Sequence, residues 1–391
     1  MDECSAALST SFSISPDEPW VREHNRQARE VVAAWRADRP IRVPLLCDDS
    51  FAHHGLYAGE AGLDYVKYYT DPDEMLRVQL EAARRRRELP IYDLALGEAP
   101  KSWPVSVDFW PVPAPGWVGC RLVYRHDAVI AHRPLNLSRE ECDALPMPDP
   151  RTGGILRRMN SFRETLSRRC AAGLTFLGRP VGPVHHGVDH YGVLAMGLDV
   201  RGHELLADLH EEPDFAARFL MKMAEWCDGL EQVWRDAPAR RRYFRNTDHG
   251  IDMLSAQTYE RFMVPIIQEM NRRRGTPLPS GLHHCGRGAH LMPVIRRYFP
   301  VERLDDLTFP AIDIARARRE VGEQVWIKAV IDDGIVCVGP PERIRQTVKD
   351  LMISGAKGRG RLALNVGDLL RGTPLEHRLA LYESVKEFGR Y

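Results

Sequence analysis

Short apolar segments alternate with longer amphipathic ones along most of the chain. Six segments are interpreted as strands, namely residues 42–47, 174–184, 243–247, a strand near 303–304, 325–331 and 361–364, of which residues 174–184 are apolar and punctuated by glycine and proline. Polar residues and then a stretch with helical spacing follow these segments. The clearest helix is predicted at residues 214–234, where apolar residues recur every three or four positions: Phe215, Phe219, Met223, Trp226, Leu230 and Val233. A further helix is predicted to begin at Asp71-Pro72, an N-cap followed by proline at the first helical position.

The repeated order of strand, polar tip and helix predicts an α/β fold with a parallel sheet. We expect a (β/α)8 TIM barrel, because in that fold all the strand tips meet at one mouth. A doubly wound open sheet is the alternative, but no Gly-x-Gly-x-x-Gly sequence follows the first strand. The expected organisation is an N-terminal tail and helix over residues 1–39 and a single barrel over residues 40–391.

One stretch interrupts the regular pattern. Residues 99–120 are rich in proline and tryptophan, residues 118–134 are typical of a hairpin, and residues 146–150 form a break. We expect an insertion over about residues 99–150. Its Trp103, Trp110 and Trp117 would either form a hydrophobic lid or pack as the core of the inserted segment.

Composition argues against several classes of function. Lys+Arg and Asp+Glu both total 54, and this balance gives no electrostatic reason to expect binding to nucleic acid or to an anionic membrane. No run of about eighteen apolar residues is present, as a membrane span would require. The first nineteen residues lack the basic start and apolar centre of a signal peptide. The eight cysteines have no paired spacing, which is typical of a reducing compartment. We expect a cytoplasmic protein.

The strand tips carry the candidate chemistry. We expect acid/base catalysis from Asp248, His249, His186 and Asp368. We expect substrate binding from Asp49, His54, Asp306, Asp332 and Asn365. Simpler roles stay open for several of them: the pair His185-His186 can cap a strand, and carboxylates at strand tips can orient histidines or cap helices.

The segment Gly281-Leu282-His283-His284-Cys285-Gly286 predicts a metal site. Alternate side chains of an extended segment point the same way, so His283 and Cys285 can face one ion. Imidazole and thiolate suit zinc better than magnesium or calcium. A zinc site needs at least a third protein ligand, for which the candidates are Asp368, Asp248, His249, His186 and Cys337.

Four motifs between residues 182 and 376 carry a family resemblance. They are Gly182-Pro183-Val184 with Gly197 and residues 205–213, Asp248 with Leu254-Ser255, Tyr259 and Pro265, the segment His283-His284-Cys285-Gly286, and Gly372-Thr373-Pro374-Leu375-Glu376. Together they resemble the superfamily of uroporphyrinogen decarboxylase and cobalamin-related methyltransferases. The third motif resembles the His-x-Cys-Gly zinc motif of the methyltransferase branch. The resemblance covers roughly residues 40–391 and implies a (β/α)8 barrel.

Two positions depart from that family pattern. The decarboxylase branch has an arginine-rich motif after its first strand, where this chain has residues 47–54 without an arginine. Porphyrinogen decarboxylation is therefore not expected. The methyltransferase branch has a further zinc-binding cysteine at its last strand tip, where this chain has Asn365-Val366-Gly367-Asp368. Any metal would then take its third ligand from an unusual place.

Three functions remain open at this point. The first is a metal-dependent methyltransferase-like enzyme in which zinc, held by His283 and Cys285, activates a thiol or another acceptor. The second is a metal-free decarboxylase or lyase of a small carboxylic acid, with Asp248, His249 and Asp368 as acid/base groups. The third is a non-catalytic barrel that binds a ligand or a corrinoid-carrying partner.

Partners and cofactors follow from the resemblance. It implies zinc as cofactor and a small-molecule substrate. The chain contains no corrinoid-binding Asp-x-His-x-x-Gly segment, so a corrinoid would arrive on a partner protein. We expect no nucleic acid and no membrane as partners, and leave a homodimer open.

Overall fold

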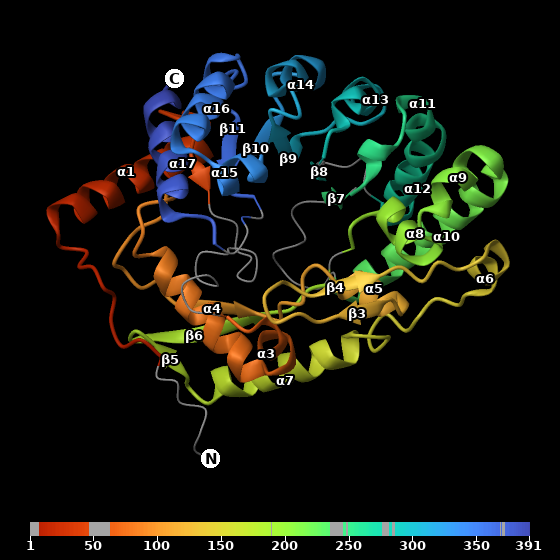
Figure 1. Ribbon diagram of the computed structural model, residues 1–391, viewed down its shortest axis with the longest axis horizontal. Coiled ribbons are helices and arrows are strands. Elements are labelled where there is room, and N and C mark those ends of the chain that lie inside the picture. Colours follow the sequence, from red (N-terminus) through yellow and green to blue (C-terminus); the bar gives the residue numbers. More distant parts are fainter. Residues whose placement is uncertain are drawn as a thin grey trace.

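The protein folds as a (β/α)8 barrel, as the sequence predicted (Figure 1). The computed structural model describes residues 8–46, 63–188, 190–234, 245–247, 249–275, 281–283, 286–367, 369 and 372–391. Within these residues the barrel strands are β1 (Leu45–Leu46), β2 (Trp103–Ser106), β6 (Arg179–His185), β7 (Arg245–Thr247), β8 (Gly281–His283), β9 (Arg303–Phe309), β10 (Trp326–Ile331) and β11 (Leu362–Asn365). One parallel arc has the order β1-β11-β10-β9-β8-β7, and β2 and β6 pair in parallel as a second arc.

Hydrogen bonds join the two arcs at both seams. At the first seam, the segment before β2 binds to β1: Asp93 N donates to Leu45 O at 3.0 Å, and Leu45 N donates to a carboxylate oxygen of Asp93 at 2.8 Å. At the second seam, His249 N after β7 donates to Tyr191 O after β6 at 2.8 Å. The ends of β6 and β7 are thus brought together at the mouth.

Helices form a ring around the strands (Figure 1). They are α3 (Tyr65–Thr70), α4 (Pro72–Arg86), α7 (Leu156–Ala171), α8 (Val193–Arg201), α9 (Glu204–Glu211), α10 (Pro213–Trp234), α11 (Ala256–Thr258), α12 (Val264–Arg274), α13 (Met292–Tyr298), α14 (Ile314–Val321), α15 (Asp333–Val338), α16 (Pro341–Ile353) and α17 (Leu375–Phe388). Three shorter helical segments are η2 (Ile251–Met253), η3 (Tyr259–Met263) and η4 (Gly288–Leu291). The predicted start of α4 is confirmed, because the Asp71 side chain accepts from Asp73 N and Pro72 is the first helical residue.

The proline- and tryptophan-rich stretch is part of the barrel at its beginning. It contains β2, in which Trp103 and Val105 are buried while Pro104 is exposed. The additional segments come after β2: α5 (Pro113–Val118), the predicted hairpin of β3 (Arg121–Val123) and β4 (Ala131–Arg133), and α6 (Arg139–Ala144). A short strand, β5 (Thr175–Phe176), then pairs antiparallel with β6. Of the two roles left open for the tryptophans, core packing applies to Trp103 and Trp117, which are each 1% exposed.

The N-terminal segment is held against the barrel rather than loose. Ser9 N and Oγ donate to the carboxylate of Glu81 at 2.7 and 2.9 Å, and Ser13 N donates to Glu88 at 2.8 Å. Both glutamates belong to α4 or the residues directly after it. The predicted N-terminal helix, α1 (Pro19–Arg36), follows this segment.

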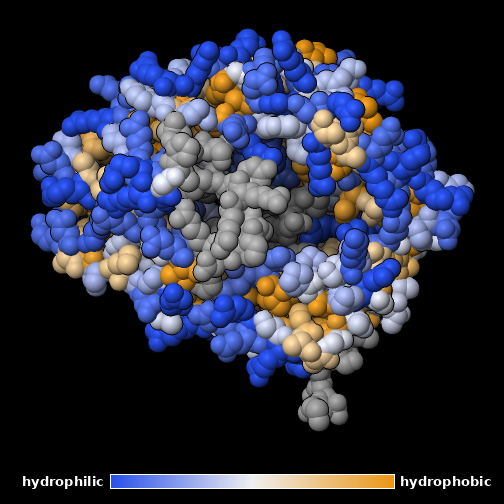
Figure 2. Space-filling model, turned by 180° about the vertical axis from the view of Figure 1, so that it is seen from behind, coloured by the Kyte–Doolittle hydropathy of each residue, from blue (hydrophilic) through white to orange (hydrophobic). Residues whose placement is uncertain are grey.

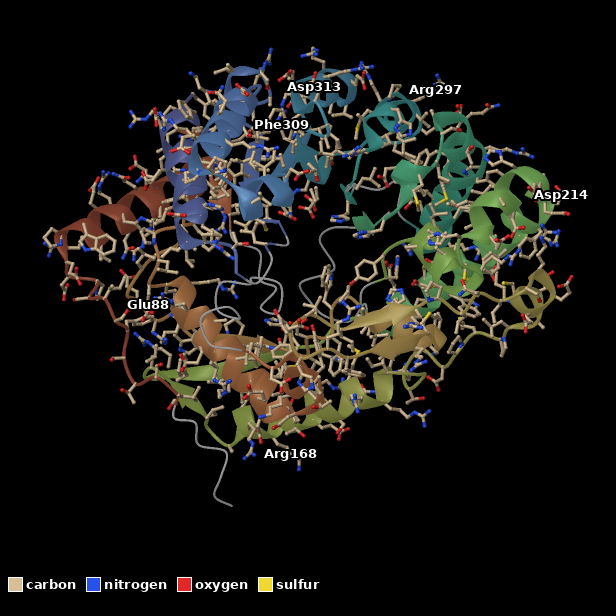
Figure 3. All side chains as sticks on the ribbon, viewed as in Figure 1. Glu88, Arg168, Asp214, Arg297, Phe309 and Asp313 are labelled. Carbon is tan, nitrogen blue, oxygen red and sulfur yellow. The ribbon has the colours of Figure 1, made fainter. Side chains whose placement is uncertain are left out.

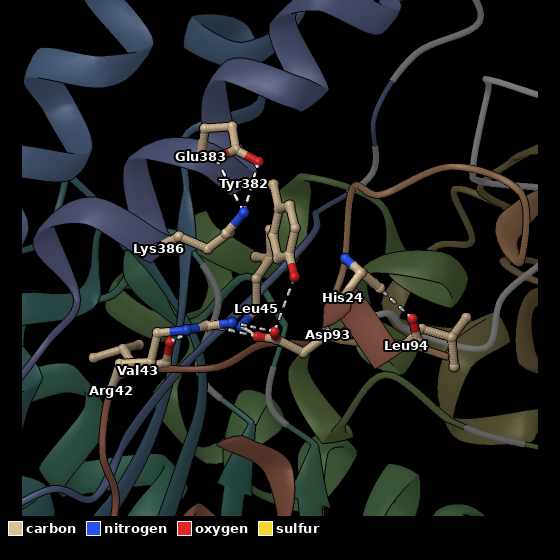
Figure 4. Close-up of polar contacts among 9 residues, drawn as sticks. All are labelled: His24, Arg42, Val43, Leu45, Asp93, Leu94, Tyr382, Glu383 and Lys386. Atoms are coloured by element: carbon tan, nitrogen blue, oxygen red, sulfur yellow. Dashed lines mark hydrogen bonds and ion pairs between the residues drawn. The ribbon is translucent and has the colours of Figure 1, made fainter. Parts of the chain in front are cut away.

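A cluster of paired buried charges lies at the N-terminal end of the barrel (Figure 4). Arg42 donates through both terminal nitrogens to Asp93, whose side chain is completely buried. Tyr382 of α17 adds its hydroxyl to the same carboxylate at 3.1 Å. The cluster therefore ties the residues before β1 to the segment before β2 and to the last helix.

The described surface is predominantly hydrophilic. Figure 2 shows charged and polar residues over most of one face, with apolar residues scattered among them. Charged side chains such as Arg168, Asp214 and Arg297 stand on the outer helices (Figure 3). Among the described residues, no helix has both the length and the apolar character needed to span a membrane.

Candidate active site

His283 is a buried histidine at the mouth of the barrel, and a carboxylate holds its ring in place. It ends β8, is buried, and its Nδ1 lies 3.0 Å from Oδ2 of Asp306 in β9. The other oxygen of Asp306 lies 3.3 Å from Nζ of Lys328 in β10. Three neighbouring strands thus place an imidazole, a carboxylate and an ammonium group in one row. A carboxylate on one ring nitrogen fixes the tautomer and the orientation of the imidazole.

Asp306 reaches His283 because its strand is bulged at this residue. Along the β9–β10 pair, Asp305 lies opposite Lys328 and Leu307 lies opposite Ala329, so Asp306 is the extra residue. Its φ of 61° is in the left-handed region, which residues with a side chain seldom adopt. A bulge redirects a side chain, and backbone strain of this kind is concentrated at functional sites. The sequence-based view of Asp306 as a strand tip was wrong, because β9 continues to Phe309.

A row of rings continues from His283 across the mouth. The His249 ring lies 4.6 Å from that of His283, measured between centroids. Tyr191 meets His249 edge-on at 4.8 Å, and Trp110 meets Tyr191 edge-on at 6.2 Å. The structure therefore brings two of the predicted site residues, His249 and His283, together. Tyr191 and Trp110 were not predicted as neighbours of this site.

Asp108 is a candidate site residue that the sequence analysis missed. It follows β2, is buried, and accepts hydrogen bonds from Tyr68 Oη at 2.7 Å and from Trp110 N at 3.3 Å. Burial and the nearby charge of Asp108 raise the pKa of Tyr68 well above its ordinary value, so Tyr68 remains a donor. The available signal was a carboxylate directly after a strand, but β2 itself had not been recognised.

The histidines after β6 have different roles. His186 is half-buried, and burial together with the charge of Arg163 lowers its pKa to about 4. It is therefore neutral at pH 7. His190 is buried, with Nε2 2.7 Å from a carboxylate oxygen of Glu231 and Nδ1 accepting from Gly192 N at 3.2 Å. Both ring nitrogens of His190 are engaged in holding this loop to α10.

Of the predicted substrate-binding residues after β10 and β11, Asp332 has a structural role. Its side chain accepts from Ile335 N at 3.3 Å and caps α15. The next residue, Asp333, packs against Gly367 at the neighbouring strand tip, where an added Cβ would collide with its carboxylate. Asn365 is buried at the end of β11, between β1 and β10.

The loop after His283 packs against Asp252 of η2. Arg287 N donates to Oδ2 of Asp252 at 3.1 Å. Gly286 has φ of 85°, and a Cβ at this position would lie 2.5 Å from the same carboxylate oxygen. Only glycine fits this close approach without a shift, which explains the glycine of the His-x-Cys-Gly segment.

Several predicted site residues lie outside the described residues, namely Asp49, His54, Asp248, Cys285 and Asp368. Within the described part of the chain, no three His, Cys, Asp or Glu side chains are grouped closely enough to hold a metal ion. His283 with Asp306 behind it has the arrangement of a single metal ligand and its orienting carboxylate. A complete site would need ligands from beyond the described set.

Comparison with known proteins agrees with this architecture. A search of curated proteins finds no match. Among solved structures, a methyltransferase from Methanosarcina mazei is similar with a TM-score of 0.61 at 14% sequence identity, covering 92% of this chain and 98% of that one. At this identity the likeness establishes the fold alone.

A family model extends the comparison to the sequence. The model for uroporphyrinogen decarboxylase (URO-D) matches residues 116–388, which is more than half of the chain. That range includes β6 to β11, with His283, Asp306 and Lys328. The chain therefore belongs to the uroporphyrinogen decarboxylase family.

Proposed function

We propose that the protein is a methyltransferase-like enzyme with a metal centre, preferably zinc, held by His283 and Cys285. The observation that carries this proposal is the 3.0 Å contact between Nδ1 of His283 and Asp306. Metal-bound histidines typically donate their second ring N–H to a carboxylate in this manner. The strained bulge that places Asp306 supports a functional role, because a merely structural contact does not require it.

The described residues have different roles in this proposed site. Asp306 holds His283 so that Nε2 is the ring nitrogen presented to a ligand. Lys328 lies 3.3 Å from the other oxygen of Asp306 and balances its charge. His249 packs against the His283 ring and limits its rotation. When bound, zinc would coordinate the acceptor thiol and deprotonate it, so that the thiolate can accept the methyl group. We further propose that the methyl group arrives on a corrinoid carried by a partner protein.

Metal content tests this proposal. Protein purified without chelator should contain about one equivalent of zinc or another transition metal, and His283→Ala and Cys285→Ser should lose it while staying folded. Cys170→Ser is the matched control. Cys170 is a half-buried cysteine in the last turn of α7, away from the strand tips, and its replacement should leave the metal in place. Metal-free wild-type protein, or equal metal loss from all three variants, would contradict the proposal.

A decarboxylase of a small carboxylic acid is the second candidate. It is favoured by Lys328, which lies beside Asp306, and by the buried Asp108 after β2, because a cation can bind the substrate carboxylate and an acid/base group can protonate the resulting carbanion. Chelation separates the two candidates. Activity that survives removal of the metal supports the decarboxylase, whereas activity that is lost and returns with zinc supports the methyltransferase.

A further inference from the structure

Arg378 is a buried cation that has no counter-ion among the described residues. It lies in the first turns of α17 and is 2% exposed. None of its three guanidinium nitrogens has a hydrogen-bond partner in the part of the chain that the structure describes. A buried charge without a partner costs several kcal/mol, so folded proteins rarely retain one. This arginine therefore points to an anion that is not part of the described chain.

Arg318 shows how the same fold treats a buried arginine with a structural role. It is 1% exposed and also lies on a helix, α14. Its guanidinium donates to three backbone carbonyls: Ala356 O at 2.7 Å, Val325 O at 3.2 Å and Arg361 O at 3.1 Å. These carbonyls precede strands β10 and β11 or lie between them, at the closed end of the barrel. Arg378 is about as buried as Arg318, but it has no hydrogen-bond acceptors among the described residues.

The position of Arg378 suits a ligand at the mouth. Long side chains of a helix lean toward its N-terminus, and the N-terminus of α17 is the end that follows the tip of β11. The N-cap residue, Pro374, gives no side-chain hydrogen bond to the first turn. The helix dipole disfavours a cation and favours an anion at this end. One turn further along α17, Tyr382 contacts Asp93, but that carboxylate already accepts from Arg42 and Leu45 as well.

We infer that Arg378 and the first turn of α17 form a binding subsite for an oxyanion, either the carboxylate or a phosphate group of a ligand. The planar guanidinium can bind either group through two parallel hydrogen bonds. The subsite goes beyond the proposed function, because it depends neither on the bound metal nor on which reaction the enzyme performs.

Thermal unfolding of the wild-type protein and of Arg378→Met tests the subsite. The proteins are dialysed into a buffer without oxyanions, and then phosphate, acetate or chloride is added at equal ionic strength. Without oxyanion, Arg378→Met should unfold a few degrees higher than the wild type, because it removes an unpaired buried charge. With phosphate or acetate the wild type should gain more than the variant. That difference is the readout, since excluded salts stabilise any folded protein.

Two further variants complete the experiment. Arg318→Met should unfold at a lower temperature than the wild type in every buffer, because it leaves three carbonyls without a donor. Arg378→Lys keeps the charge but loses the planar fork, so its response to the oxyanion should be weaker than that of the wild type. It serves as the test if Arg378→Met does not fold.

Each outcome either supports or overturns the oxyanion subsite at Arg378. A response to acetate identifies a carboxylate subsite, and a response to phosphate alone identifies a phosphate subsite. The inference is overturned if Arg378→Met is destabilised in the absence of oxyanion, as Arg318→Met is expected to be. It is equally overturned if the wild type and the Arg378 variants respond to phosphate and acetate alike.

Discussion

The closed end of the barrel and its mouth place charged groups in opposite ways. At the closed end, Asp93 accepts from Arg42, Leu45 and Tyr382, and Arg318 donates to three carbonyls. At the mouth, Asp306 stands in a strained backbone conformation and shares its two oxygens between His283 and Lys328. At the closed end, charged groups with several hydrogen-bond partners hold the ring of strands together. At the mouth, we propose that charged side chains on a strained backbone bind a ligand. This is the end of a barrel at which active sites lie.

The largest effect expected from this difference is a loss of stability at the closed end. Asp93→Ala leaves Arg42 buried without its partner and should lower the free energy of unfolding by about 4 kcal/mol. Urea denaturation at pH 7 measures the change. Asp93→Asn, which keeps the shape of the side chain, should cost less. A loss below about 1 kcal/mol would mean that the pair behaves like one on the surface.

The pH dependence of stability should reveal His186 at the mouth. Its folded-state pKa of about 4 lies below the ordinary value of 6.5, so the unfolded chain binds the proton more tightly. Neutral His186 therefore contributes stability above about pH 6.5, and this contribution, at most about 3 kcal/mol, is lost as the pH falls toward 4. Comparing urea denaturation of the wild type and His186→Gln at pH 7 and pH 5 isolates it. An equal decline in both proteins would rule out His186 as the cause.

Asp306→Asn should separate function from stability at the mouth. Asparagine tolerates the left-handed conformation, so the free energy of unfolding should change little. Loss of the carboxylate behind His283 should weaken metal binding by about 10- to 100-fold, as measured by competition with a chromophoric chelator. Asp305→Asn, one residue earlier on the same strand, is the control. Equal losses of affinity in the two variants would show that His283 does not depend on Asp306.

The smallest expected effect concerns Gly286, which follows the segment that we propose binds the metal. Gly275 serves as the reference, because its φ of 65° is left-handed while the space around it is open. Gly275→Ala should lower the free energy of unfolding by about 1 kcal/mol. Gly286→Ala adds a collision with Asp252 and should cost more. Urea denaturation of the two variants gives the difference directly. If the two losses are equal, the carboxylate of Asp252 moves away at no cost.

Sequence patterns predicted the parts of the fold that depend on local rules. The apolar spacing through Phe215, Phe219 and Met223 gave α10 to within one residue. The Asp71-Pro72 start of α4 is set by local capping chemistry and was predicted correctly. The segment at Trp103 was assigned to an insertion because Pro104 is unusual within a strand. Asp108 was missed for the same reason, since it follows that strand.

The site was harder to predict because its geometry depends on contacts between strands. Two adjacent aspartates looked like a strand tip, whereas the register of β9 against β10 makes Asp306 a bulge that turns toward His283. The choice between Asp332 and Asp333 as the cap of α15 depends on backbone angles that a sequence does not show. The orphaned guanidinium of Arg378 was likewise invisible, because burial and missing acceptors are properties of the folded chain.

Anomalous diffraction from crystals at the zinc absorption edge tests the central claim most directly. The claim is that His283, held by Asp306, is a ligand of a metal at the mouth. The account predicts an anomalous peak within bonding distance, about 2 Å, of Nε2 of His283, with Asp306 still on Nδ1. Crystals grown with zinc that show no peak there, or a metal bound without His283, would contradict it.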